Sequence, residues 1–276
     1  MSGSQIIDLL FTADRNYVNY IAIVLKSLQI NDFEVQYRVH LIHDDLNTEQ
    51  QLKFQYDCIS LGYEAFTYQV NDAVLLSAPV NKHYAPAMYY RLLAGEILPD
   101  SVKKVIYLDP DLLIINPLHP LWEINMDQAV FLAASHTEEI EIVDNFNRLR
   151  LNTSSSYFNT GVMVIDLEKM RQVVQKKDIY DFIDKNAMKL LLPDQDVFNA
   201  LYGHLSNPIP DTVWNYDVRK YKQYFVRSGG ITDDRWIMQN TAILHFCGKN
   251  KPWQSGYHSR FGNIYLHYMN LAGVLG

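Results

Sequence analysis

The chain has 276 residues, 48% of them hydrophobic and 13% aromatic, so it can bury a substantial core and is not disordered throughout. Its net charge of −7 argues against a general nucleic-acid-binding protein, because phosphate neutralisation requires clustered lysine and arginine. Only Cys58 and Cys247 occur, without the spacing of a metal cluster, which argues against a disulfide framework and fits a reducing cytoplasm. An anionic ligand is therefore expected to bind locally, through a metal ion.

The first 70 residues alternate between strand and helix patterns, after a polar leader that lacks the pattern of a signal peptide. Strand patterns cover residues 5–13, 37–42 and 64–70, and helix patterns cover residues 16–30 and 48–61. Thr48 and Gln51 form a candidate capping box for the second helix. This β-α-β-α-β order predicts a mainly parallel sheet with its ligand crevice beyond the carboxyl ends of the strands.

The rest of the chain continues the α/β pattern and then becomes irregular. Helices are expected over residues 86–98, 168–192 and 194–202, and strands before Asp109 and over residues 128–134 and 157–167. Residues 206–239 show little periodicity and are expected to form loops that face an acceptor. No repeat, linker or membrane-spanning run is visible, so we expect one α/β domain over residues 5–276.

Two carboxylates, Asp109 and Asp111, directly follow an apolar strand pattern. Such a pair can hold a divalent metal ion against a nucleotide diphosphate. The pattern alone is weak evidence, because Asp194 and Asp196 form a second Asp-x-Asp. The structural alternative is a solvated turn after a buried strand.

Five motifs, in this order and spacing, resemble glycosyltransferase family 8: FTADRNY at 11–17, YLDPD at 107–111, FNTG at 158–161, DQD at 194–196 and HFCGKNKPW at 245–253. Within that family the chain is similar to bacterial lipopolysaccharide α-galactosyltransferases and glucosyltransferases, and more distantly to glycogenin. The resemblance covers residues 5–253. It implies the nucleotide-sugar-binding α/β fold called GT-A, with a mixed, mainly parallel sheet flanked by helices.

The resemblance further implies that Asp109, Asp111 and His245 bind Mn²⁺, with Mg²⁺ as the alternative. A donor set of carboxylate oxygens and one imidazole nitrogen favours Mn²⁺. A lone histidine at a strand end is more often structural, but Gly248 and Lys251 in the same motif favour a ligand role. Gly248 allows the backbone to approach a diphosphate closely, and Lys251 can neutralise charge on the departing phosphate.

Four residues at the end of the first strand match the family's nucleotide site. Asp14 resembles the uracil-reading carboxylate and Tyr17 the stacking aromatic, while Thr12 and Asn16 flank the nucleotide. This combination predicts UDP over other nucleotides. Each role has a structural alternative, because Tyr17 can belong to the core and Asp14 and Asn16 can cap the following helix.

Four further residues are expected near the diphosphate and the donor sugar. Arg91 matches a family arginine beside the sugar, and His83 is placed for a diphosphate contact. An ordinary ion pair for Arg91 and an exposed structural role for His83 are the alternatives. Asn159 occupies the position that contacts sugar hydroxyls. Thr160 replaces the family's more usual Ala or Ser, a change that can alter the sugar pocket.

The resemblance implies transfer with retention, from UDP-galactose or UDP-glucose to a hydroxyl of a lipo-oligosaccharide, glycoprotein or other glycan. The metal and Lys251 would stabilise the leaving UDP. Gln195 matches the family residue near the anomeric carbon, but a neutral amide is a poor nucleophile, so we expect it to position and polarise. Asp194 is expected to contact donor hydroxyls, whereas Asp196 can equally complement a helix dipole. A covalent intermediate and same-face attack both remain open.

Two rival functions are compatible with the same pattern. One is a catalytically silent UDP-sugar-binding or scaffold protein. The other is a Mg²⁺-dependent nucleotidyltransferase, which should carry a glycine-rich phosphate loop near the first strand, whereas residues 11–17 contain no glycine.

The C-terminal residues 260–276 contain aromatic side chains but few cations. A polybasic membrane attachment is therefore not supported, and a buried helix is expected instead. Phe261, Tyr265 and Tyr268 leave peripheral membrane contact open. The expected location is the cytoplasm, including the inner face of the membrane.

Overall fold

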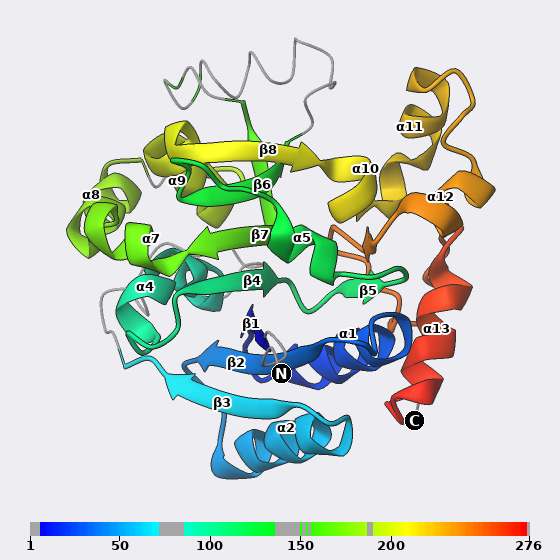
Figure 1. Cartoon of the computed structure of the whole chain (residues 1–276), viewed down its shortest axis with the longest axis horizontal. Helices are drawn as coiled ribbons and strands as arrows, with labels where there is room; N and C mark the ends of the chain where they lie inside the picture. Colours follow the sequence, from blue (N-terminus) through cyan, green and yellow to red (C-terminus); the bar gives the residue numbers. More distant parts are fainter. Residues whose placement is uncertain are drawn as a thin grey trace, which may run out of the picture.

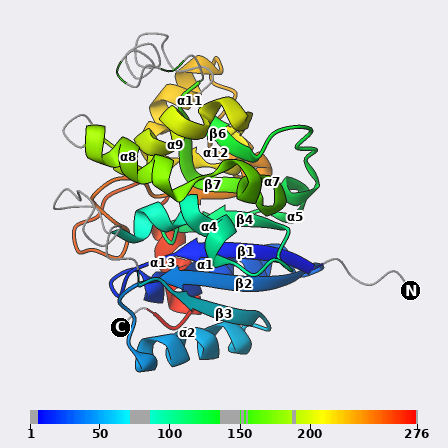
Figure 2. The same cartoon turned by 90° about the vertical axis from the view of Figure 1, so that its left-hand side faces the viewer.

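The computed structural model describes residues 6–71, 86–135, 150, 153, 156–186 and 190–274, and its strands form two sheets. The large sheet has seven strands in the order β3-β2-β1-β4-β7-β6-β8. In that order they span Glu64–Gln69, Gln36–His43, Ile6–Thr12, Lys104–Leu108, Phe158–Asp166, Phe131–Ser135 and Ser206–Pro210. Neighbouring strands are parallel except for β7, which runs antiparallel to β4 and β6. The predicted mixed, mainly parallel sheet is thus confirmed (Figure 2), with β3 at the bottom of the view and β6 near the top.

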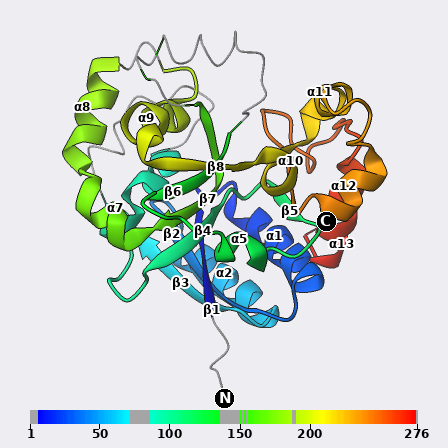
Figure 3. The ribbon, with the colours of Figure 1, turned by 45° about the horizontal axis from the view of Figure 1, so that its top comes forward.

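Helices cover both faces of the large sheet, as expected for central strands that carry apolar side chains on both faces. Central strands such as β1 are buried almost along their whole length because each face carries its own apolar cluster. One face packs against α1, α2 and α5, which span Val18–Asn31, Thr48–Ser60 and His119–Glu123. The other packs against η1, α4, α7, α8 and α9, which span Pro86–Leu93, Ala94–Ile97, Leu167–Val173, Lys176–Asn186 and Pro193–Tyr202. Figure 3 shows α7, α8 and α9 on one side of the strands and α1, α2 and α5 on the other.

A small sheet of three strands, in the order β5-β10-β9, lies beside the large one. These strands span Leu112–Ile114, Ile243–His245 and Tyr216–Asp217. Their apolar cluster includes side chains of α11, α12 and α13, which span Tyr221–Arg227, Asp234–Asn240 and Gly262–Leu271. Figure 1 shows these three helices on the right-hand side of the view, where β5 also lies. The short elements α10, η3 and η4 span Asp211–Trp214, Gly203–Leu205 and Val218–Lys220. Because β4 belongs to the large sheet and β5 to the small one, the turn between them joins the two.

Several predicted elements differ from the structure in detail. The helix expected over residues 86–98 begins as the 3-10 helix η1, and the one expected over 168–192 breaks between α7 and α8. The capping box of α2 uses Asn47 and Gln50, one residue before the predicted pair, because Thr48 is already helical while Asn47 is extended. Residues 206–239 are not only loops, since they contain β8, β9 and three α-helices.

The expected C-terminal helix is α13, and both Phe261 and Tyr265 are buried against its neighbours. These two aromatic side chains are therefore part of the core. Among the residues that the structure describes, no helix has the length and apolar character needed to cross a bilayer.

Candidate active site

Asp109 and Asp111 flank the turn that links the two sheets. β4 ends at Leu108, and β5 begins at Leu112 and pairs antiparallel with β10, so that Leu112 lies opposite His245. The N–H of Phe246 donates to the carbonyl of Asp111 at 3.0 Å and closes this end of the ladder. Strand pairing therefore brings His245 to two carboxylates more than 100 positions away in the sequence.

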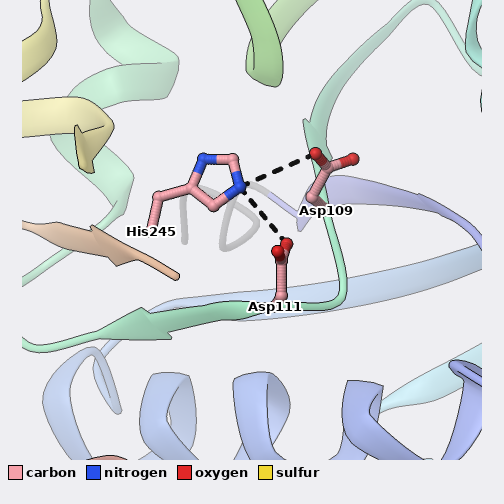
Figure 4. A group of neighbouring side chains, drawn as sticks. All are labelled: Asp109, Asp111 and His245. Carbon is pink, nitrogen blue, oxygen red and sulfur yellow. Dashed lines mark ion pairs between the residues drawn. The ribbon is translucent and has the colours of Figure 1, made fainter. Parts of the chain in front are cut away.

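The three side chains predicted as metal ligands converge in the structure. His245 Nε2 lies 3.2 Å from Asp111 Oδ1 and 3.8 Å from Asp109 Oδ2, and Figure 4 shows the ring pointing at both carboxylates. These distances are close to the separation of about 3 Å between adjacent ligands of an octahedral divalent ion. Two carboxylates and one imidazole, each offering an atom within 4.8 Å of the others, fit a divalent metal such as Mn²⁺.

Asp111 and His245 are buried, and each changes the charge state of the other. Burial alone would raise the pKa of Asp111, but His245 and the ammonium of Lys251, which donates to Asp111 Oδ2, hold that pKa well below its usual range. Burial alone would lower the pKa of His245, but Cys247 and Asp111 raise it well above its ordinary value. Protons therefore compete with a metal for His245, and metal affinity should rise with pH.

Arg91 holds Asp109 from the opposite side. The residue is 6% exposed, and its guanidinium lies 3.0 Å from Asp109 Oδ1 and 3.6 Å from Asp194 Oδ2 and donates to the carbonyl of Thr160 at 2.8 Å. The Tyr107 hydroxyl donates to the same Asp109 oxygen at 2.7 Å. Arg91 thus forms buried rather than surface ion pairs, and it links the predicted metal ligand to the predicted sugar-binding carboxylate.

The predicted donor-sugar residues lie together at the start of β7 and of α9. Thr160 Oγ1 donates to Asp194 Oδ2 at 3.1 Å, and both residues are buried. Burial raises the pKa of Asp194, against the opposing effect of Arg91. Gln195 follows on the first turn of α9 and is half-buried.

Asp196 is occupied within the protein. Its carboxylate pairs with Arg150 at 2.7 Å and accepts hydrogen bonds from the Tyr157 hydroxyl and the N–H groups of Leu191 and Leu192. This carboxylate therefore anchors the segments around α9, whereas the carboxylate of Asp194 contacts Thr160 and Arg91.

At the end of β1, the predicted nucleotide residues also have structural partners. Asp14 Oδ1 accepts from the N–H groups of Asn16 and Tyr17 at 2.8 and 3.0 Å, so this carboxylate orders the turn into α1. Thr12 Oγ1 is buried and lies 3.0 Å from the Tyr107 hydroxyl. Tyr17 is half-buried, with its ring edge-on to Trp253 at 5.8 Å. The helix-capping alternative for Asp14 and Asn16 is not realised, because the N-cap position of α1 is Tyr17 and no side chain caps the helix. Tyr17 packs partly buried against the core cluster, in line with its structural alternative.

Gly248 has a second reason to be glycine. Its φ is +95°, a left-handed conformation that favours glycine, and a Cβ there would come within 2.7 Å of Arg219 Nη1. Arg219 is held by Asp217, which accepts from its Nη2 at 2.6 Å. Asp217 lies opposite His245 in the β9–β10 pairing, so this arginine is placed beside the loop that carries Gly248 and Lys251.

Residue 161 must be glycine, because the predicted metal ligands occupy the space where a side chain would lie. A Cβ at this position would lie 2.3 Å from His245 Cε1 and 2.8 Å from Asp109 Oδ2, closer than real side chains approach. The glycine of the FNTG motif therefore leaves the space that the ligands occupy.

Sequence reasoning missed Arg219, Asn215 and the steric role of Gly161. Arg219 and Asn215 lie in the segment that was expected to be loops, and no spacing signal marks them. Asn215 contacts a predicted metal ligand, through a hydrogen bond of 2.7 Å between its Oδ1 and His245 Nδ1. His83, predicted for the diphosphate, lies outside the described residues.

Comparison with known proteins gives consistent matches. Residues 8–256 match the family model for glycosyl transferase family 8. The chain is 27% identical to General stress protein A of Bacillus subtilis strain 168, covering 98% of this chain and 95% of that protein. It is 22% identical to a lipopolysaccharide 1,2-glucosyltransferase of Escherichia coli K12, over 92% and 74% of the two chains. Among solved structures, the galactosyltransferase LgtC with donor and acceptor sugar analogs matches with a TM-score of 0.79 and 23% identity, over 97% and 95%.

Proposed function

Because the chain belongs to glycosyltransferase family 8 and has the GT-A fold, we propose that it transfers galactose or glucose from a UDP-α-sugar to a glycan hydroxyl. The convergence of Asp109, Asp111 and His245 at the strand ends carries this proposal. Lipopolysaccharide glycosyltransferases among the relatives favour a lipo-oligosaccharide acceptor over a glycoprotein.

The main chemical demand of sugar transfer is the negative charge that develops on the departing diphosphate. A divalent ion, Mn²⁺ in this proposal, would be held by Asp109, Asp111 and His245 and would offset that charge when bound. Lys251 is buried, and its ammonium lies against Asp111, so a protein cation stands beside the metal position. Arg219, whose side chain is 55% exposed, adds a second cation next to Gly248.

The donor sugar is proposed to lie over Asp194, Asn159 and Thr160. Arg91 fixes the two carboxylates on either side of this position, because it contacts both Asp109 and Asp194. Gln195 is proposed to position the anomeric carbon and polarise its surroundings without forming a bond to it.

The candidate functions predict different outcomes in assays with UDP-sugars and with nucleoside triphosphates. A panel of UDP-sugars with Mn²⁺ should show slow hydrolysis of UDP-galactose or UDP-glucose before any acceptor is known. A silent binding protein would bind UDP-sugar and leave it intact. A nucleotidyltransferase would consume a nucleoside triphosphate with Mg²⁺ instead.

Replacing Gln195 with alanine should slow sugar transfer and leave the product in the α configuration, because the amide is proposed to orient the donor and not to bond with it. Proton NMR of the new linkage gives the configuration directly. A β-linked product from the wild type would contradict the retaining mechanism. An unchanged rate in the Gln195→Ala variant would remove the positioning role.

Replacing Asp14 with alanine should weaken UDP binding by about 1–3 kcal/mol, because it leaves a base edge without its hydrogen-bonding partner. Calorimetric titration with UDP and GDP measures both the affinity and the loss of discrimination. Since Asp14 also orders the turn into α1, Asp166→Ala is the matched control: it removes the side-chain cap of α7, at a cost of about 0.5–2 kcal/mol, and Asp166 lies opposite Lys104, at the end of β4 away from Asp109. Equal UDP affinity in the Asp14→Ala variant and the wild type would contradict the assignment.

A further inference from the structure

His245 has two ring nitrogens, and the structure gives them different partners. Nε2 faces Asp109 and Asp111, whereas Nδ1 lies 2.7 Å from Asn215 Oδ1. A neutral imidazole can bind a metal only through the nitrogen that carries no proton. The hydrogen-bonding partner of Nδ1 therefore decides which of the two ring nitrogens keeps its proton.

The orientation of the Asn215 amide follows from a backbone group that cannot be reversed. The N–H of Gly161 can only donate, and it points at Asn159 at 2.9 Å, so the Asn159 atom there must be the carbonyl oxygen. Asn215 also contacts this oxygen, at 2.8 Å, and must present its NH₂ group to it. The oxygen of Asn215 then faces His245 Nδ1 and requires a proton on that nitrogen.

We propose that Asn215 is the positioning residue of the metal centre: it keeps the proton on Nδ1 of His245, so that Nε2 presents its lone pair to the ion. This inference rests on the proposed metal-binding function of Asp109, Asp111 and His245. Asn215 does not contact the metal itself. It acts through the histidine, as partners of metal-bound imidazoles commonly do.

The backbone around Asn215 supports a fixed position. The residue is 3% exposed, its N–H donates to the carbonyl of Asp211 at 3.0 Å, and Tyr216 after it pairs with Leu244 of β10. The hydrogen-bonded series runs from the Gly161 N–H through Asn159 and Asn215 to His245. It therefore joins β7 of the large sheet to β10 of the small sheet at the metal position.

The same hydrogen bonds also decide which polar group of the Asn159 side chain can bind a substrate. Its carbonyl oxygen already accepts two hydrogen bonds, from Gly161 and Asn215. Within the part of the chain that the structure describes, its NH₂ group is the one left to meet a donor hydroxyl. Asn159 would thus donate to a sugar oxygen and would not accept from a sugar hydroxyl.

Metal affinity measured without any nucleotide tests the proposal. Asn215→Ala should weaken Mn²⁺ binding by roughly 10- to 100-fold in calorimetry, the usual effect of removing a partner of a metal-bound histidine. Asn116→Ala is the matched control, because it removes two hydrogen bonds, to Met238 and Thr241, near the same strands without touching His245. The control should bind Mn²⁺ like the wild type.

A double-mutant cycle separates positioning from simple loss of stability. Asn159→Ala should weaken Mn²⁺ binding in the wild-type background and have no further effect when residue 215 is alanine, since it acts through the Asn215 amide. Additive effects would contradict the series. Wild-type affinity in Asn215→Ala would overturn the proposal.

A spectroscopic measurement on the wild type avoids any dependence on folding of the variants. With ¹⁵N-labelled histidine and Zn²⁺ as a diamagnetic probe, His245 should show a protonated Nδ1 and a metal-bound Nε2. A protonated Nε2 with metal on Nδ1 would overturn the proposal. Failure of wild-type protein to bind either ion would instead contradict the metal centre, and hence the proposed function.

Discussion

Replacing Asp111 with asparagine is expected to reduce metal-dependent turnover of UDP-sugar by at least about 100-fold, because a bound metal contributes several kcal/mol of charge stabilisation in such reactions. Asp111 is the carboxylate on which both His245 and Lys251 converge. The neutral amide removes one charged ligand and leaves Lys251 without its anionic partner. The rate of UDP release in the presence of Mn²⁺ measures the effect.

Asp8→Asn is a closely matched control for this variant. Asp8 and Asp111 are 7% and 6% exposed, and each carboxylate pairs with one histidine and one cation. Asp8 lies in β1 and pairs with Arg38 and His40, away from the candidate site. Both variants should lose some thermal stability, and only Asp111→Asn should lose turnover. Wild-type turnover in Asp111→Asn would exclude the metal role of this residue.

Replacing Gly161 with alanine is expected to abolish measurable Mn²⁺ binding or weaken it by at least about 10- to 100-fold, as losses of ligand support do. The added Cβ would come within 2.3 Å of His245 and 2.8 Å of Asp109. Neither side chain can move away freely, because Asn215 holds the histidine and Arg91 with Tyr107 holds the carboxylate. Calorimetry with Mn²⁺ measures the loss.

Gly95→Ala provides the comparison for a buried glycine outside the site. The atoms nearest to its Cβ would belong to the flexible side chains of Arg171 and Met170, at 3.3 to 3.4 Å, and alanine is favoured in the helix α4 that contains it. This variant should bind Mn²⁺ like the wild type and remain folded. If Gly161→Ala binds Mn²⁺ equally well, the position of the ligands around Gly161 is wrong.

The fold of residues 6–70 could be predicted because local patterns there agree with the tertiary structure. Residues 5–13 read as a fully buried strand, and β1 is covered on both faces. The α1 pattern places Ile21, Val24 and Leu28 on one face, and these residues are buried. In such segments the period of the apolar residues is sufficient, because the same side chains form the core.

The strands and helices of residues 206–239 could not be predicted from the period of the apolar residues. Strand β8 contains Pro208 and Pro210, which normally argue against a strand, yet it pairs with β6 at the edge of the sheet, where a missing N–H is tolerated. Strand β9 has only two residues, too few to show a period. Both strands exist because of partners that are distant in sequence.

The residues of the candidate site also fall into two groups, those that a sequence motif marks and those that no local pattern marks. Asp109, Asp111 and His245 were predicted from motifs, and their convergence follows from the β5–β10 pairing. The roles of Asn215 and Arg219 depend on the pairing of β9 with β10, because this register places the two residues next to His245 and its loop. A motif marks residues that meet the ligand, whereas the groups that orient those residues can come from any segment that packs nearby.

The central claim is that Asp109, Asp111 and His245 hold a divalent ion against a nucleotide diphosphate. It is tested most directly by titrating UDP into wild-type protein in Mn²⁺ and again in EDTA. We predict that Mn²⁺ tightens UDP binding by at least about 10-fold, and that UDP tightens Mn²⁺ binding by the same factor, because coupling between two ligands is reciprocal. Equal UDP affinity with and without Mn²⁺ would contradict the account.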